Sequence, residues 1–263
     1  MNIRCAVAVL AACVSGCAGP ALRPSLAPSA PKHEALLVLP GFGYGRDDDK
    51  TFRAVARTAS AAGVDVFVAP FLSRAGLDAS RDKLARFIRD NQLHRYERLH
   101  VFAFIAGGWT VNPLVEGGGL PNLVSITYDR SPYQERAPRV AAASLPLFAW
   151  LRHGSTVFDI ARTPYPPLAA SHVRVGLMVE SRPTSFIRRR EAAARRYGPF
   201  AFGCETLLQR HDDCLYLAMD HDDVYARFAE VWPELIAFIR TGRFSHAANR
   251  TTPIDDPLVW RRK

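Results

Sequence analysis

The stretch "VFAFIAGGWT" (Val101–Thr110) determines how this chain folds. A continuous apolar run ends at Ile105 and is followed by an alanine and two glycines. This pattern predicts a buried β-strand that turns sharply into a helix, because small side chains let the two elements pack closely. We therefore expect Ile105 at the strand–helix turn, and no room for larger side chains at Ala103 or at positions 106–108.

Apolar runs and amphipathic segments alternate along the rest of the chain, as they do in proteins built from βαβ units. The sequence therefore predicts one α/β domain over residues 34–263, with a doubly wound, mostly parallel sheet. The expected strands cover residues 35–42, 64–71, 98–105, 123–129, 172–181 and 214–220. The clearest expected helices cover residues 47–63 and 78–92.

Residues 133–171 lose this alternation and predict an insertion with one or two helices that covers the carboxyl edge of the sheet. Prolines mark two further irregularities, since proline removes a helical hydrogen bond. Pro113 should shorten or kink the helix that follows Ile105. Pro233 should begin a second helix after a break at Trp232, with Gly242 as its C-terminal stop.

The first residues have the layout of an export signal: an arginine, a short apolar stretch and then small residues. We expect residues 1–16 to be a signal peptide. "VSGC", ending at Cys17, resembles a bacterial lipobox and implies a lipidated (palmitate-bearing) cysteine; an ordinary signal cleaved nearby is the alternative. Residues 17–33 are rich in Pro and Ala and predict a tether. The expected location is the periplasmic face of the bacterial outer membrane, with the membrane as partner through the lipid anchor.

The chain has a formal net charge of +9, most of it from arginine. A nucleic-acid partner would call for an aromatic platform or a known module, and neither is found. The charge is instead typical of solvated helix faces, with attraction to an anionic membrane as a second interpretation. Once the signal and Cys17 are set aside, Cys204 and Cys214 remain. In an oxidising compartment these two predict a disulfide, with two separate buried thiols as the alternative.

The turn in "FAFIAGG" resembles the nucleophile elbow G-x-S-x-G of the α/β-hydrolase superfamily, nearest its lipase and esterase branch. The resemblance covers most of the chain from Ala35 to Phe244. It implies a backbone strained at the elbow, with Ile105 where the family carries the nucleophilic serine. It also implies that the backbone N–H groups of Phe42 and Ala106 form the oxyanion hole.

The same resemblance implies a catalytic base after the last strand, where "LYLAMDHDDV" places His221. The triad acid should lie in a loop that precedes this histidine. Glu180, in "VESRPTS", and Glu205, in "FAFGCET", are both candidates, and neither matches the family motif well. A structural hydrogen bond or a helix cap is the simpler interpretation of His221.

Isoleucine can neither attack an acyl carbon nor share a proton, so the sequence predicts a non-catalytic binding or scaffold protein. The alternative is a serine ester hydrolase that uses a relocated nucleophile, Ser131 or less well Ser73, with His221. No cofactor is expected. A lipid or another acyl compound is a possible ligand, and the sequence does not identify a protein partner.

The motifs "HDDC" and "DHDD" also offer metal-ligand side chains, but their spacing matches no known site, and we predict no metal. The residues concerned are His211, Asp212, Asp213, Asp220, His221 and Asp222.

Overall fold

The computed structural model describes residues 33–45, 48–129, 136–198, 203–206 and 209–251 of the 263. Six strands form one sheet in the order β2-β1-β3-β4-β5-β6, and every neighbouring pair is parallel. The α/β fold with a parallel sheet is therefore confirmed. The strands are β1 (Glu34–Leu39), β2 (Val64–Val68), β3 (Arg98–Phe104), β4 (Leu123–Asp129), β5 (Arg174–Arg182) and β6 (Asp213–Asp220).

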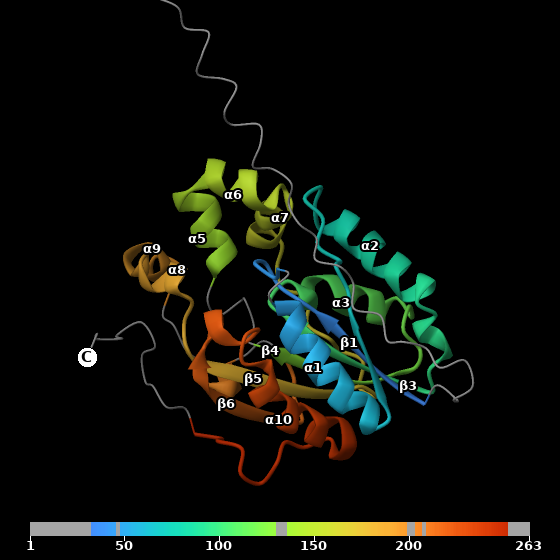
Figure 1. The fold of residues 1–263 in the computed structure, drawn as a ribbon. Helices are drawn as coiled ribbons and strands as arrows, with labels where there is room; N and C mark the ends of the chain where they lie inside the picture. Colours follow the sequence, from blue (N-terminus) through green and yellow to red (C-terminus); the bar gives the residue numbers. More distant parts are fainter. Residues whose placement is uncertain (1–32, 46–47, 130–135, 199–202, 207–208, 252–263) are drawn as a thin grey trace, which may run out of the picture.

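Helices cover both faces of this sheet, so the doubly wound arrangement is also confirmed (Figure 1). Helices α1 (Asp48–Ala61) and α10 (Phe228–Thr241) pack together over one face, where a core cluster gathers around Phe52, Phe102 and Phe228. Helices α2 (Leu77–Asp90) and α3 (Gly107–Glu116) pack together over the other face. The strands between them are almost wholly buried, which explains their continuous apolar sequences.

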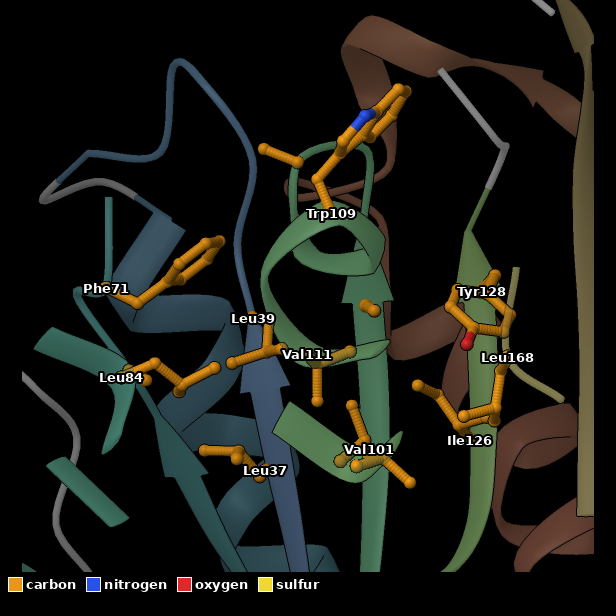
Figure 2. Packing of buried hydrophobic residues seen from close by; sticks show 14 of the residues in the cluster. Leu37, Leu39, Phe71, Leu84, Val101, Trp109, Val111, Ile126, Tyr128 and Leu168 are labelled. Atoms are coloured by element: carbon orange, nitrogen blue, oxygen red, sulfur yellow. The ribbon is translucent and has the colours of Figure 1, made fainter. Parts of the chain in front are cut away.

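Helix α3 lies close against β1 and β3, as the small residues at the turn predicted. A Cβ atom on Gly107 would stand 2.9 Å from the Cβ of Ala103 and 3.2 Å from that of Leu39. A Cβ on Gly108 would meet the ring of Tyr165 at 2.8 Å. Figure 2 shows Val111 on this helix pointing toward the strands that carry Leu39 and Val101. Close packing therefore explains both glycines.

Pro113 lies inside α3 and does not end it, so the expected shortening is wrong: the helix continues to Glu116. Proline at this position leaves the carbonyl of Trp109, four residues earlier, without its helical donor. The guanidinium of Arg81, on α2, donates to that carbonyl through Nε at 3.4 Å and Nη2 at 3.3 Å. A neighbouring helix thus supplies the hydrogen bond that the proline removes.

The break expected at Trp232 is also wrong, because α10 runs without interruption from Phe228 to Thr241. Pro233 lies in its second turn and removes only the bond to the carbonyl of Ala229. Ala229 is exposed, so water can solvate that carbonyl. Gly242 ends the helix in a left-handed conformation (φ 76°), as predicted.

The insertion contains three short helices rather than the one or two expected: α5 (Ala137–Ser144), α6 (Pro146–His153) and α7 (Thr156–Arg162). They pack against one another beyond the carboxyl ends of the strands (Figure 1). The arginine-rich segment after β5 forms two short helices, α8 (Ser185–Arg188) and α9 (Glu191–Arg195). Three 3₁₀ turns, η1 (Leu93–Arg95), η2 (Cys204–Thr206) and η3 (His221–Asp223), complete the described elements.

Cys204 and Cys214 form the predicted disulfide, with their Cα atoms 6.3 Å apart. The bond fastens η2 to the start of β6, and the N–H of Cys204 also donates to the hydroxyl of Tyr216 at 3.0 Å. The expected signal peptide, Cys17 and Ser131 lie outside the described residues, as does the tether apart from His33. Among the helices that the structure describes, none is long and apolar enough to cross a bilayer.

Candidate active site

The carboxyl ends of β5 and β6 bring Glu180 and His221 together. Nδ1 of His221 lies 2.6 Å from Oε1 of Glu180, and the glutamate side chain is completely buried. The register of the β5–β6 pairing shifts just after Glu180. When Nδ1–H of the neutral ring donates to the carboxylate, the lone pair remains on Nε2, as in the base of a catalytic triad.

Of the two candidate acids, Glu180 is therefore the one that contacts His221. Glu205 lies in η2 with an exposed side chain. The sequence offered both glutamates without a way to choose between them.

A second carboxylate, which the sequence analysis missed, reaches the same histidine. Asp129 is the last residue of β4; it is buried, and its Oδ2 lies 3.9 Å from Nδ1 of His221. An acidic residue that ends an apolar strand of a parallel sheet was the signal, because ligands bind at the carboxyl ends of such strands. Within the described residues, Asp129, Glu180 and His221 are the one group of three metal-ligand side chains that lie together.

The other candidate metal ligands serve the fold instead. Asp213 pairs with Arg250 at 2.9 Å, and Asp220 pairs with Arg188 at 3.1 Å. Asp212 accepts a hydrogen bond from the N–H of Val175 at 2.7 Å. Asp222 accepts one from the N–H of Ser185 at 2.8 Å, and His211 is exposed.

The oxyanion-loop positions also lie at this edge. Ala106 is buried at the start of α3, and Phe42 follows β1 on the neighbouring strand. Neither N–H group donates a hydrogen bond to another described residue. The adjacent N–H of Gly41 is occupied, since it donates to the hydroxyl of Tyr225 at 2.6 Å. Phe42 lines the cavity described below, whereas Ala106 is fully buried and is not among its lining residues.

Ile105 lies at the predicted turn between β3 and α3, but its backbone is not strained as the elbow resemblance implied. Among the described residues, the non-glycine residues with positive φ are Gln92 and Arg136. Ile105 thus keeps a negative φ, which suits a β-branched side chain. A nucleophile elbow holds its serine on a strained turn that exposes the side chain. The chain therefore departs from the elbow in backbone conformation as well as in residue type.

These elements surround a cavity of about 670 Å³ between the carboxyl edge of the sheet and the helices α5–α8. Its volume falls within the range of small-molecule sites. Apolar side chains dominate the wall, and His221 and Tyr225 contribute polar groups near the sheet. The apolar side chains include Phe42, Ile105, Leu145, Phe148, Val157 and Phe186.

No protein-family model matches the chain, and no curated protein matches it in sequence. Solved structures do match, among them the protein Est1E from Butyrivibrio proteoclasticus. It is 14% identical, with a TM-score of 0.52 over 82% of this chain and 91% of that chain. A type II thioesterase, BorB, from the borrelidin biosynthetic cluster is also 14% identical, with a TM-score of 0.53 over 84% of this chain and 96% of the other. The chain has an α/β-hydrolase fold.

An esterase from Pyrococcus furiosus has the same fold, at 14% identity and a TM-score of 0.51, over 81% of this chain and 84% of that chain. In α/β-hydrolases the triad follows the chain order serine, acid, histidine. Ile105, Glu180 and His221 occur in this order at the ends of β3, β5 and β6.

Proposed function

We propose that this chain is a non-catalytic binding or scaffold protein with an α/β-hydrolase fold, held by a lipid at the periplasmic face of the bacterial outer membrane. One observation carries the non-catalytic part of the proposal. An isoleucine with a relaxed backbone lies where a hydrolase needs a nucleophile, and it lines the same cavity as His221. A general base accelerates acyl transfer only when there is a group for it to deprotonate.

The other hydroxyl groups that line the cavity in the described part of the chain contact groups within the fold. Thr184 caps α8 by accepting from the N–H of Ile187 at 3.4 Å. The Ser185 hydroxyl contacts the Arg189 guanidinium at 3.5 Å, and the Tyr225 hydroxyl accepts from Gly41. The polar pair of His221 and Glu180 then acts as a buried hydrogen bond that supports the fold.

Hydrolysis of p-nitrophenyl esters of short and long acyl chains tests this proposal. We expect wild-type turnover at the buffer background, and Ile105→Ser should add little, because the backbone at the turn does not present the side chain as an elbow does. The matched control is Ile105→Val, which preserves the branched apolar side chain. Wild-type turnover above background that disappears in His221→Ala would overturn the proposal.

The short contact between His221 and Glu180 favours one other function, ester hydrolysis with a relocated nucleophile. Ser131 follows β4 in the sequence, although it lies outside the described residues. If this function is correct, Ser131→Ala should abolish turnover, whereas Ser73→Ala should leave it intact. If the wild-type protein has no turnover, this second function is excluded together with any other relocated nucleophile.

The lipid anchor has its own test, independent of the cavity. Metabolic labelling with an alkyne analogue of palmitate should mark the wild-type protein in the outer-membrane fraction. Cys17→Ala should abolish the label, whereas Cys13→Ala, within the apolar stretch, should leave it in place. An unlabelled wild-type product would overturn the anchoring part of the proposal and leave the non-catalytic part untouched.

A further inference from the structure

Three arginines lie at the rim of the cavity. Arg152 is in the last turn of α6, and Arg189 and Arg190 directly follow α8. No carboxylate of the described residues pairs with any of them, whereas the adjacent Arg188 pairs with Asp220. The rim therefore carries positive charge that the described residues leave uncompensated.

This positive charge also acts on His153, which lines the cavity next to Arg152. Burial, followed by repulsion from Arg152 and Arg74, lowers the pKa of its ring to about 4. Asp222, the one carboxylate among the described residues that line the cavity, already accepts a hydrogen bond from the backbone N–H of Ser185. A ligand group that meets the rim at neutral pH is thus favoured when it is anionic.

The sheet end of the cavity has the opposite character. Ile105 brings a branched apolar side chain to this end, and Phe42 and Val157 continue the apolar wall toward the helices. The buried carboxylates of Glu180 and Asp129 lie behind His221. A hydrocarbon chain would be accommodated by the apolar wall at this end.

Helix α6 adds an apolar outer surface beside the rim. Leu147, Phe148, Trp150 and Leu151 are 70%, 56%, 53% and 38% exposed, and they are the exposed large hydrophobic residues of the described chain. Ala149 on the opposite side of the helix is buried, and Phe148 also lines the cavity. Exposed apolar patches of this kind mark binding surfaces, and this one is continuous with the cavity wall.

We propose that the cavity binds an anionic single-chain amphiphile, with its hydrocarbon tail directed toward Ile105 and its head group on Arg152, Arg189 and Arg190. This orientation is the reverse of the one that hydrolysis would require, since a hydrolase must place the head-group carbonyl at the nucleophile position. The inference rests on the proposed non-catalytic function, and the apolar surface of α6 is the path by which the tail enters.

Calorimetric titration with oleate, oleoyl phosphate and neutral monooleoylglycerol, each below its aggregation concentration, tests the ligand class. We expect one site per chain, and about tenfold weaker binding of the neutral compound, since charge-assisted hydrogen bonds contribute on that scale. Arg189→Gln combined with Arg190→Gln should remove this preference. The matched control is Arg86→Gln with Arg89→Gln, which removes the same charge from exposed positions on α2 and should change nothing.

A fatty acid that carries a diazirine at its tail end tests the orientation. Photolysis should cross-link the tail to peptides that contain Ile105 or Val157. Cross-links confined to residues 186–190 would overturn the orientation, and equal affinity for charged and neutral compounds would overturn the role of the arginines. If no amphiphile binds and ester turnover is also absent, the inference fails while the non-catalytic function stands. Release of glycerol from monooleoylglycerol would instead overturn the proposed function itself.

Discussion

The ends of β3, β5 and β6 lie at one edge of the sheet. The end of β3 carries an apolar side chain, whereas the ends of β5 and β6 carry a polar pair. At β5 and β6 a buried glutamate and a histidine are 2.6 Å apart, as an acid and a base are in a hydrolase. At β3 the small residues of an elbow are present, but an isoleucine with a negative φ takes the nucleophile position. Under the proposed function, the acid–base pair at β5 and β6 has no group to deprotonate at the end of β3.

Packing alone accounts for what is present in both regions. Gly107 is required by the closeness of Ala103 and Leu39, whatever residue precedes it. The hydrogen bond from His221 satisfies an oxygen of the buried Glu180 carboxylate, and a buried polar group is costly when it lacks a hydrogen bond. Features that resemble a catalytic motif can therefore be retained for stability, and the residue that carries the chemistry decides between the two interpretations.

The largest effect on stability should come from the pair of Glu180 and His221 at the ends of β5 and β6. Glu180→Ala removes the buried carboxylate that is hydrogen-bonded to Nδ1 of His221 and leaves a cavity in its place, so we expect a loss of about 3 kcal/mol in the free energy of unfolding. Urea unfolding monitored by circular dichroism measures it. The control is Glu205→Ala at the rejected acid position, which is exposed and should change stability by less than about 0.5 kcal/mol. Equal losses in the two variants would contradict the assignment of Glu180.

Loss of the disulfide at the start of β6 should have the next largest effect on stability. Replacing Cys204 and Cys214 together by serine removes the bond that closes a loop between two residues ten positions apart. In the chain-entropy description this costs about 2–3 kcal/mol of stability. A thiol count on the unfolded, unreduced wild-type protein should find neither cysteine reactive. Two reactive thiols, or a double variant as stable as the wild type, would contradict this prediction.

The turn after β3 can be tested through the close packing of its small residues. Gly107→Ala places a methyl group against Ala103 and should destabilise the fold by about 2 kcal/mol, as overpacking typically does. The double variant Ala103→Gly, Gly107→Ala moves the methyl group to the other side of this contact. It should recover part of the lost stability. If Gly107→Ala has no effect on thermal unfolding, the small residues at the turn need another explanation.

The smallest effect concerns the proline in α3. Arg81→Ala should cost about 1 kcal/mol, because the Trp109 carbonyl loses its donor. In a Pro113→Ala background residue 113 regains a backbone N–H that can donate to the Trp109 carbonyl. Arg81→Ala should then reduce stability by less. A double-mutant cycle measures this coupling, and strictly additive effects would show that Arg81 does not compensate for the proline.

The repeating pattern made most of the fold predictable from the sequence. Buried parallel strands are continuous apolar runs, so β4 was placed at Leu123–Asp129 with both ends correct. The errors arose where distant residues compensate for a local defect. The sequence around Pro113 does not show the contact with Arg81, and the sequence around Pro233 does not show that Ala229 is exposed. For this reason α3 was expected to shorten or kink, and α10 was expected to break at Trp232.

The candidate site was predictable in its positions and not in its geometry. Chain order placed Ile105 and His221, because strand ends in this fold have fixed places. The choice of Glu180 over Glu205 depended on a contact with His221 that the sequence does not show, and Asp129 was missed because its strand had no family motif. The negative φ of Ile105 has no signature in the residues themselves.

Covalent labelling tests the central claim most directly. Purified wild-type protein is incubated with excess fluorophosphonate, and its intact mass is measured over time. The account predicts no adduct, because no described side chain beside His221 is activated for attack, and none should appear in Ser131→Ala either. A stoichiometric adduct that is lost in His221→Ala would show that the chain is a serine hydrolase and would contradict the account.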